Sequence, residues 1–80
     1  MSTEILIIDD NADIRIILRD LINDAGYSTR VAANYNQALL EIDKKLPDVA
    51  IIDVKLDKGD NDGIELLSHI KKKNKDIPVI

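Results

Sequence analysis

The sequence predicts an α/β domain in which a parallel sheet carries helices on both of its faces. Short apolar runs, typical of strands, alternate with longer segments whose apolar residues recur at helical spacing. The resulting order is strand, helix, strand, helix, strand, helix, strand, and this alternation favours parallel strands joined by right-handed crossovers. With 80 residues, the chain is long enough for one small domain.

The first part of the chain predicts a buried strand followed by a helix. Residues 4–9, EILIID, form a continuous apolar run, as expected for a strand that is covered on both faces. Asn11 or Asp13 is suited to cap the start of the helix, and Gly26 is suited to close its end. The apolar face of this helix consists of Ile14, Ile17, Leu18, Leu21, Ile22 and Ala25.

The middle of the chain predicts an edge strand, a second helix and a second buried strand. Residues 27–32, YSTRVA, are more polar and alternate weakly, which indicates a strand at a sheet edge. Asn34 is suited to cap the next helix, and Pro47 follows its end. Residues 48–53, DVAIID, repeat the apolar pattern of the first strand. The apolar residues of the second helix are Ala38, Leu39, Ile42 and Leu46.

The last part of the chain predicts a third helix and a fourth strand. Residues 63–74, GIELLSHIKKKN, end in lysines, which suit the negative end of a helix dipole. Residues 77–80, IPVI, have the composition of a strand, with Pro78 near its start. A sheet without a helix after its last strand keeps an uncovered edge, so we expect residues 1–80 to form an incomplete domain. The apolar residues of the third helix are Ile64, Leu67 and Ile70.

The composition disfavours several classes of function. The chain is 45% apolar and 32% charged, with a net charge of −4, which is typical of an acidic globular protein. An acidic chain is poorly suited to bind nucleic acid directly. There is no cysteine, which excludes disulfides and thiolate chemistry and fits a cytoplasmic protein. The apolar run near the start is too short for a signal peptide or a membrane span, so we expect no membrane contact.

Acidic residues follow two of the apolar strands. Asp9 and Asp10 follow the first strand, and Asp53 ends the third. If the two strands are neighbours in a parallel sheet, their three carboxylates converge at one edge. Adjacent carboxylates require a raised pKa or a bound cation, and oxygen ligands suit Mg²⁺. The pattern therefore predicts a Mg²⁺-assisted phosphoryl site with Asp53 as nucleophile, and helix capping by Asp9 and Asp10 is the alternative.

Three segments of the chain resemble one known family. Residues 5–15 (ILIIDDNADIR), 48–67 (DVAIIDVKLDKGDNDGIELL) and 77–80 (IPVI) are similar in order and spacing to the receiver domain of two-component response regulators. The resemblance implies a flavodoxin-like, doubly wound parallel sheet with strand order 2-1-3-4-5. It also implies that residues 1–80 hold a receiver domain truncated after its fourth strand. The Ser or Thr after the fourth strand and the Lys after the fifth, which sense the phosphoryl group in the family, have no counterpart here.

The resemblance assigns a role to each acidic residue of the predicted site. Asp53 becomes the phosphoacceptor, which takes a phosphoryl group from a phosphohistidine of a sensor histidine kinase. Asp10 and Asp53 would ligate Mg²⁺ by their side chains, Lys55 through its backbone carbonyl, and Asp9 through a bound water. The chain would then be a phosphorylation switch in transcription regulation and not an enzyme, with at most slow self-dephosphorylation. Its output would lie C-terminal to the domain, and a second copy of the chain is a further candidate partner.

The loop after the third strand separates this chain from most receivers. Between Leu56 and Asp62-Gly63 it is longer than usual and lacks the common proline, which resembles the NtrX-like subgroup of nitrogen-regulation response regulators. Its acids do not fit a calcium loop, because with Gly63 at position 6 the required acids at positions 1 and 12 are replaced by Lys58 and His69. We therefore expect a solvated loop whose last acid begins the third helix. The acids concerned are Asp57, Asp60 and Asp62.

Two other functions compete with the receiver interpretation. An aspartate at the end of an apolar strand also resembles haloacid-dehalogenase phosphatases, but Lys55 stands where that family has its second aspartate. A Mg²⁺-dependent phosphohydrolase that uses Asp53 and an interaction module that is never phosphorylated are the alternatives. His69 is the one histidine, and its position in the middle of a helix predicts a surface or boundary residue away from the site.

Overall fold

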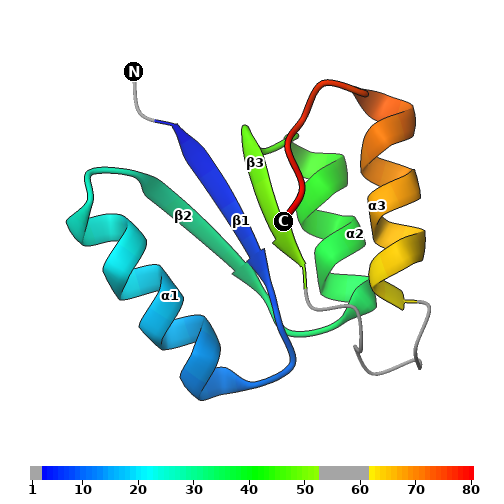
Figure 1. Cartoon of the computed structure of the whole chain (residues 1–80). Helices are drawn as coiled ribbons and strands as arrows, with labels where there is room; N and C mark the ends of the chain where they lie inside the picture. Colours follow the sequence, from blue (N-terminus) through cyan, green and yellow to red (C-terminus); the bar gives the residue numbers. More distant parts are fainter. Residues whose placement is uncertain (1–2, 53–61) are drawn as a thin grey trace.

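The structure is a computed structural model, and it describes residues 3–52 and 62–80. The predicted alternation of strands and helices is confirmed for these residues (Figure 1). Within them, no helix combines the length and the hydropathy needed to span a membrane. In chain order the elements are β1 (Glu4–Ile8), α1 (Ala12–Asp24), β2 (Ser28–Ala32), α2 (Tyr35–Lys44), β3 (Val49–Ile52) and α3 (Asp62–Lys73).

The central strand of the sheet is β1, which pairs in parallel with β2 on one side and with β3 on the other. At its carboxyl end, Ile8 lies opposite Ala32 of β2 and opposite Ile52 of β3. The order β2-β1-β3 confirms the flavodoxin-like topology for these strands, and β2 occupies an edge as predicted. All three strands end at the same edge of the sheet (Figure 1).

The predicted fourth strand is present only as a short stretch beside β3. Ala50 pairs with Leu6 of β1 and forms a parallel bridge with Val79, so residues 77–80 take the fourth place in the sheet. The Ala50 N–H donates to the Pro78 carbonyl at 3.0 Å, and the Ile80 N–H donates to the Ala50 carbonyl at 2.9 Å. The prediction of a full strand was wrong in extent, and Pro78 contributes to this because it has no N–H to donate.

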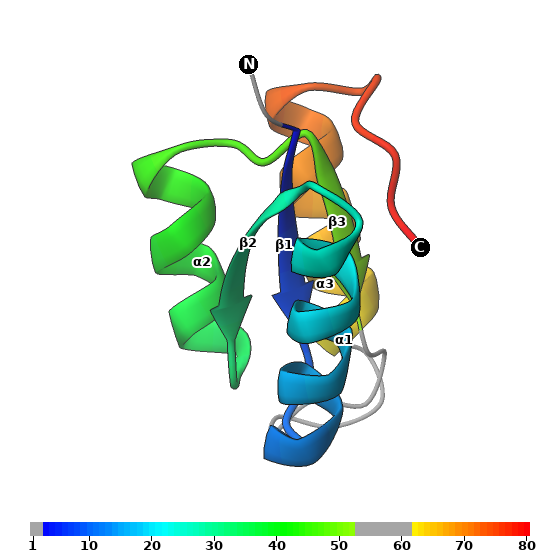
Figure 2. The same ribbon diagram turned by 90° about the vertical axis from the view of Figure 1, so that its left-hand side faces the viewer.

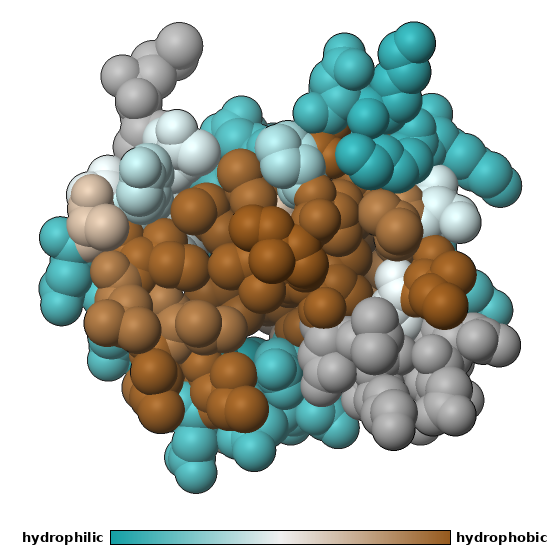
Figure 3. Space-filling view, in the orientation of Figure 1, coloured by the Kyte–Doolittle hydropathy of each residue, from teal (hydrophilic) through white to brown (hydrophobic). Residues whose placement is uncertain are grey.

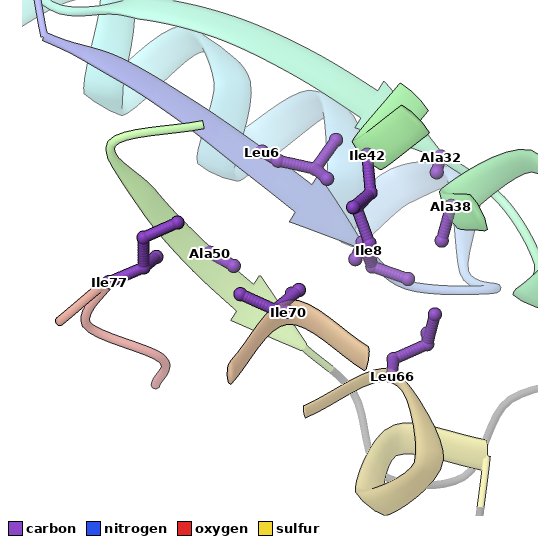
Figure 4. Packing of buried hydrophobic residues seen from close by; sticks show 9 residues of the cluster. All are labelled: Leu6, Ile8, Ala32, Ala38, Ile42, Ala50, Leu66, Ile70 and Ile77. Carbon is purple, nitrogen blue, oxygen red and sulfur yellow. The ribbon is translucent and has the colours of Figure 1, made fainter. Parts of the chain in front are cut away.

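Helices cover the two faces of the sheet unequally. Helix α1 lies on one face, whereas α2 and α3 pack together against the other (Figures 1 and 2). The main hydrophobic cluster fills the space between the sheet and the α2–α3 layer (Figure 4). Its buried members are Leu6, Ile8, Ala32, Ala38, Ile42, Ala50, Leu66, Ile70 and Ile77.

The face that carries α1 is only partly covered. Ile5 and Ile7 of β1 are buried, as predicted, and alternation along the strand directs them away from the main cluster. Helix α1 itself has no buried residue, and Ile14, Ile17 and Leu21 are 42%, 57% and 62% exposed. Apolar side chains consequently gather across the middle of this face (Figure 3).

The burial of β3 and α3 differs from the burial that the sequence predicts. Only Ala50 of β3 is buried. Val49 and Ile51 alternate with it toward the other face and are half-buried, because α1 contacts mainly β1 and β2, whereas Ile52 packs against the margin of the main cluster. Full cover on both faces, which the apolar run predicted, is therefore wrong for this strand. In α3, Leu66 and Ile70 enter the core, whereas Ile64 is 55% exposed. The buried side of α3 thus differs from the predicted one at Ile64 and Leu67 and agrees with it at Ile70.

Helix caps set the start and end of α1, as the sequence predicts. The Asn11 side chain is the N-cap and accepts hydrogen bonds from the N–H groups of Asp13 at 2.9 Å and Ile14 at 3.2 Å. Gly26 follows the helix with a φ of 98°, a left-handed conformation that glycine adopts without strain. Asn34 caps α2 in the same way, with the Gln37 N–H as donor at 2.8 Å.

Arg30 of β2 links the sheet to α2 at the end of the sheet that lies opposite Asp9 and Asp10. Its guanidinium donates to the carbonyls of Glu41 at 2.8 Å and Lys45 at 2.5 Å, which lie at the C-terminal end of the helix. Its Nε also lies 3.0 Å from a carboxylate oxygen of Glu4 in β1. Both of these atoms are buried, and among the described residues neither has a partner in hydrogen-bond geometry, so we describe their contact as an ion pair. This cation therefore links β1, β2 and α2 at the edge remote from Asp9.

Replacing Ile42 with alanine should lower the free energy of unfolding by about 2–4 kcal/mol, because the side chain is fully buried against β1 and its loss leaves a cavity. Leu40→Ala on the same helix is the matched control. Leu40 is 61% exposed, so this variant should change the free energy by less than about 0.5 kcal/mol. Urea denaturation of both variants checks the prediction, and equal losses would contradict the position of the core.

Candidate functional site

The candidate site lies at the sheet edge where β1 and β3 end. Ile8 and Ile52 are register partners at this edge, and Asp9 and Asp10 follow Ile8 directly. The predicted strand-end position of these two acids is therefore confirmed. Asp53 follows Ile52 in the chain but lies outside the described residues, as does Lys55. The convergence of three carboxylates accordingly stays a prediction.

Asp9 is held by three hydrogen bonds that leave it little freedom. Its N–H donates to the Ala32 carbonyl at 3.2 Å, which is the last bond of the ladder between β1 and β2 because Ala32 is the partner of Ile8. Its carboxylate accepts from the Asn11 N–H at 2.9 Å, in a local turn around Asp10. Its carbonyl accepts from Nη1 of Arg15 at 2.7 Å. The residue is half-buried, and one carboxylate oxygen, Oδ1, is the acceptor of the bond from Asn11.

Asp10 is exposed, and its carboxylate has no hydrogen-bond or ion-pair partner within residues 3–52 and 62–80. The alternative that Asp9 and Asp10 are helix caps is wrong, because Asn11 performs this role. Neither acid accepts from a free N–H group of the first helical turn. Both carboxylates therefore keep oxygen atoms that are available to a cation or a water.

Arg15 is a part of the site that the sequence interpretation missed. It lies in the first turns of α1, six residues after Asp9, and its side chain is half-buried. A sequence signal did exist, because an arginine one turn into a helix can reach back over the preceding loop. That signal names no partner, and the carbonyl it contacts is fixed only by the conformation of the loop.

The described residues supply only part of a metal site. Among them, no group of three or more histidine, cysteine, aspartate or glutamate side chains gathers closely enough to hold a metal ion. Two of the four predicted ligands, Asp53 and Lys55, fall outside this part of the chain. The donors that the structure does describe are carboxylates, and all-oxygen donor sets suit a hard cation such as Mg²⁺.

An apolar hollow of about 160 Å³ lies beside the end of β3. It carries almost no polar surface and so offers no metal ligands. Helix α3 begins next to it at Asp62, as the sequence predicts, whereas Asp57 and Asp60 lie outside the described residues. The hollow is lined by Ile52, Gly63, Ile64, Leu67, Val79 and Ile80.

His69 lies on α3 and faces α2, away from the acidic edge, as predicted. Its Nε2 is 3.3 Å from Asp43 of α2, and the ammonium of Lys73 is 3.4 Å from the same carboxylate oxygen. The hydrogen bond from His69, followed by that from Lys73, holds the pKa of Asp43 below its ordinary value, although desolvation opposes them. This cluster joins the two helices and takes no part in the candidate site.

The fold and its edge define a class of protein: a parallel α/β domain with paired acids beyond the central strand. Comparison with known families assigns the class, since the response regulator receiver domain family matches residues 5–80. The chain belongs to this family, and the predicted resemblance is confirmed.

Relatives and solved structures agree with this assignment. The nitrogen assimilation regulatory protein NtrX of Azorhizobium caulinodans is 38% identical over 80 residues, and the sporulation initiation phosphotransferase F of Bacillus subtilis is 42% identical over 80 residues. The crystal structure of NtrX from Brucella abortus superposes with a TM-score of 0.88 at 35% identity and covers 99% of this chain. The chemotaxis response regulator CheY4 of Vibrio cholerae gives 0.89 at 28% identity, also over 99%.

The chain spans unequal shares of these relatives. All of it aligns to 18% of the Azorhizobium NtrX and to 63% of the Bacillus protein. In the structures it covers 18% of the Brucella NtrX and 66% of CheY4. NtrX and the NtrX-like regulators of Rickettsia are among the similar proteins, which agrees with the resemblance that the long loop predicts.

Asp43→Asn should lower the melting temperature slightly at neutral pH, and the difference from the wild type should shrink as the pH falls below roughly 4. The sign follows from the lowered pKa of Asp43. A carboxylate that is more acidic in the folded state stabilises it above its ordinary pKa, and this contribution disappears as the folded protein takes up the proton. Calorimetric melting between acid and neutral pH measures the effect.

Asp24→Asn is the matched control for this prediction. It removes the same charge from the last residue of α1, where a negative group opposes the helix dipole. It should therefore not lower the melting temperature at neutral pH. A constant difference between Asp43→Asn and the wild type at all pH values would contradict the role of the charged pair.

Proposed function

We propose that this chain is the phosphoacceptor domain of a two-component response regulator and that Asp53 receives the phosphoryl group. One observation carries the proposal. In a chain of the receiver family, two acids with accessible oxygens follow β1 at the edge where β3, the strand before Asp53, also ends. The acceptor would thus stand beside a preformed acidic edge. The domain proposed for this role extends over residues 1–80.

The chemistry of the transfer suits an aspartate with these neighbours. A carboxylate oxygen of Asp53 attacks the phosphorus of a phosphohistidine, the P–N bond breaks as the P–O bond forms, and the imidazole leaves and takes up a proton. The product is an acyl phosphate on the protein. Asp9 and Asp10 alone would repel the incoming phosphoryl oxygens, so the step needs a positive charge at the same edge.

Mg²⁺ is the cation that we propose for this charge. Asp10 and Asp53 would ligate it by their carboxylates, Lys55 through its backbone carbonyl, and Asp9 through a water. The exposed Asp10 carboxylate, which has no protein partner among the described residues, fits this assignment. When bound, the ion neutralises the charge that develops on the transferred phosphoryl group. The role of the protein is to hold the acids in place, and in particular to fix Asp9.

The proposed partners follow from the family. A sensor histidine kinase is the proposed donor of the phosphoryl group, and the domain would act as a switch with at most slow self-dephosphorylation, not as an enzyme. The similarity to NtrX and to the transcriptional regulatory protein ZraR of Klebsiella oxytoca supports transcription regulation as the output, encoded C-terminal to the receiver domain. The absence of cysteine suits the cytoplasm, where we propose that it works. Homodimer formation stays a prediction.

Incubation of the full-length protein with acetyl phosphate and Mg²⁺ should add one phosphoryl group, because a small acyl phosphate can supply the same electrophilic phosphorus as the kinase. Asp53→Asn should abolish the addition, since an amide is not a competent nucleophile here. Asp60→Asn, in the same loop, is the control and should retain it. Intact-mass measurement follows the adduct.

The other outcomes identify the competing functions. Release of many equivalents of phosphate per chain would favour a phosphohydrolase that uses Asp53. Absence of any adduct in the wild-type protein would leave the interaction module and overturn the proposal.

Asp10→Asn should weaken Mg²⁺ binding by roughly tenfold or more, because it removes one charged ligand from the ion. Asp60→Asn should change the dissociation constant little, since we expect this acid to be solvated. Amide chemical shifts recorded during a Mg²⁺ titration measure both constants. Equal weakening in the two variants would mean that the cation binds elsewhere.

A further inference from the structure

We infer that Arg15 is a positioning residue for the acidic edge. Its guanidinium holds the peptide group between Asp9 and Asp10 and so orients the Asp10 carboxylate toward the cation. This inference rests on the proposed function. It adds to the site a residue of α1 that is not itself a ligand of the proposed Mg²⁺ ion. The observation behind it is the hydrogen bond of 2.7 Å from Arg15 Nη1 to the Asp9 carbonyl oxygen.

Arg15 bonds to a backbone carbonyl although carboxylates are close to it in the chain. Three aspartates, Asp9, Asp10 and Asp13, precede it in the chain by six residues or fewer. A guanidinium pairs readily with carboxylates, yet within residues 3–52 and 62–80 Arg15 forms no ion pair with any of them. It donates to a backbone carbonyl instead. The Arg15 guanidinium thus fixes the backbone of the loop and leaves the carboxylate oxygens of the three aspartates free of ion pairs with it.

Peptide planarity transmits this contact to Asp10. The Asp9 carbonyl and the Asp10 N–H belong to one rigid plane, so a bond to the former fixes the direction of the latter. Asp9 is already anchored through its N–H to Ala32 and through its carboxylate to Asn11. With its carbonyl also held, the Asp10 Cα, which lies in the same plane, is fixed as well, and the direction of the Asp10 side chain depends mainly on the φ and χ angles of Asp10 itself.

The inference can be tested through Mg²⁺ affinity, because the loss of a positioning residue and the loss of a nearby positive charge should change this affinity in opposite directions. A permanent positive charge beside a Mg²⁺ site repels the ion, so its removal alone should tighten binding. Loss of the peptide anchor should weaken binding, because a ligand that is free to rotate must be ordered by the ion. The sign of the change therefore separates a positioning residue from a nearby charge.

The decisive comparison is between Arg15→Met and Arg19→Met. Both variants remove one positive charge from α1, but Arg19 lies one turn further on and pairs with Asp20 at 3.2 Å, away from the acidic edge. We expect Arg15→Met to raise the Mg²⁺ dissociation constant by about tenfold. Arg19→Met should leave it unchanged or lower it. Arg15→Lys keeps a donor and a charge and should recover part of the affinity.

A second measurement is independent of the metal. In the metal-free protein, Arg15→Met should shift or broaden the amide resonance of Asp10, because its peptide plane is no longer held. Arg19→Met should leave this resonance in place. If Arg15→Met proves too unstable to study, Arg15→Ala, which also removes the donor and suits a helix, is used for both measurements, and an affinity and an Asp10 resonance like those of Arg19→Met would overturn the inference.

The remaining outcomes are unambiguous. A lower melting temperature for Arg15→Met with an unchanged Mg²⁺ dissociation constant would assign Arg15 a purely structural role and overturn the inference. Tighter binding in Arg15→Met would do the same and would identify charge repulsion as its main effect. If the wild-type protein neither binds Mg²⁺ nor accepts a phosphoryl group, the proposed function fails, and the inference fails with it. If the wild-type protein binds Mg²⁺ and accepts a phosphoryl group, and Arg15→Met does not change the Mg²⁺ dissociation constant, the inference is overturned but the proposed function is not.

Discussion

The parallel pairing of β1 with strands on both sides is the constraint on which the rest of the structure depends. Residues 5–8 are buried, and their backbone groups find partners in β2 and β3. Because all pairs are parallel, every strand ends at one edge, and polar residues that follow an apolar strand must emerge there. The Asp9 N–H donates to the carbonyl of Ala32, the partner of Ile8, so the first acid of the site is still bonded to the sheet. The acidic edge is therefore a direct product of strand register.

The two faces of the sheet are stabilised in different ways. Between the sheet and the α2–α3 layer, burial of aliphatic side chains dominates, and Arg30 secures the remote end of α2. On the other face, α1 leaves large parts of its apolar side chains in solvent, so its caps contribute a greater share of its stability. Asn11 is one of these caps and also bonds to Asp9. Local hydrogen bonds, more than burial, thus fix the start of α1 next to the site.

How much was predictable depended on the range of the interactions involved. The order of strands and helices and the caps at Asn11, Gly26 and Asn34 follow from local periodicity and local backbone preferences, and they were predicted correctly. The incomplete burial of Val49 and Ile51 in β3 was not predicted, because cover of their face by α1 is a tertiary property that an apolar run does not encode. For the site, Asp9 and Asp10 were placed correctly by their position after a strand. The hydrogen bond of Arg15 was not predicted, since its acceptor is a backbone atom in a loop.

The loop between β1 and α1 separates two tasks that acidic residues could have combined. An aspartate that caps a helix directs its carboxylate at backbone N–H groups and has fewer oxygens left for a cation. Here a neutral asparagine caps the helix, so the negative charges of Asp9 and Asp10 are not engaged by the first turn of α1. Arg15 is likewise directed to a carbonyl and, within the described residues, forms an ion pair with neither acid. In both cases a contact that orders the backbone leaves carboxylate oxygens available, which is the condition that the proposed divalent cation at this edge requires.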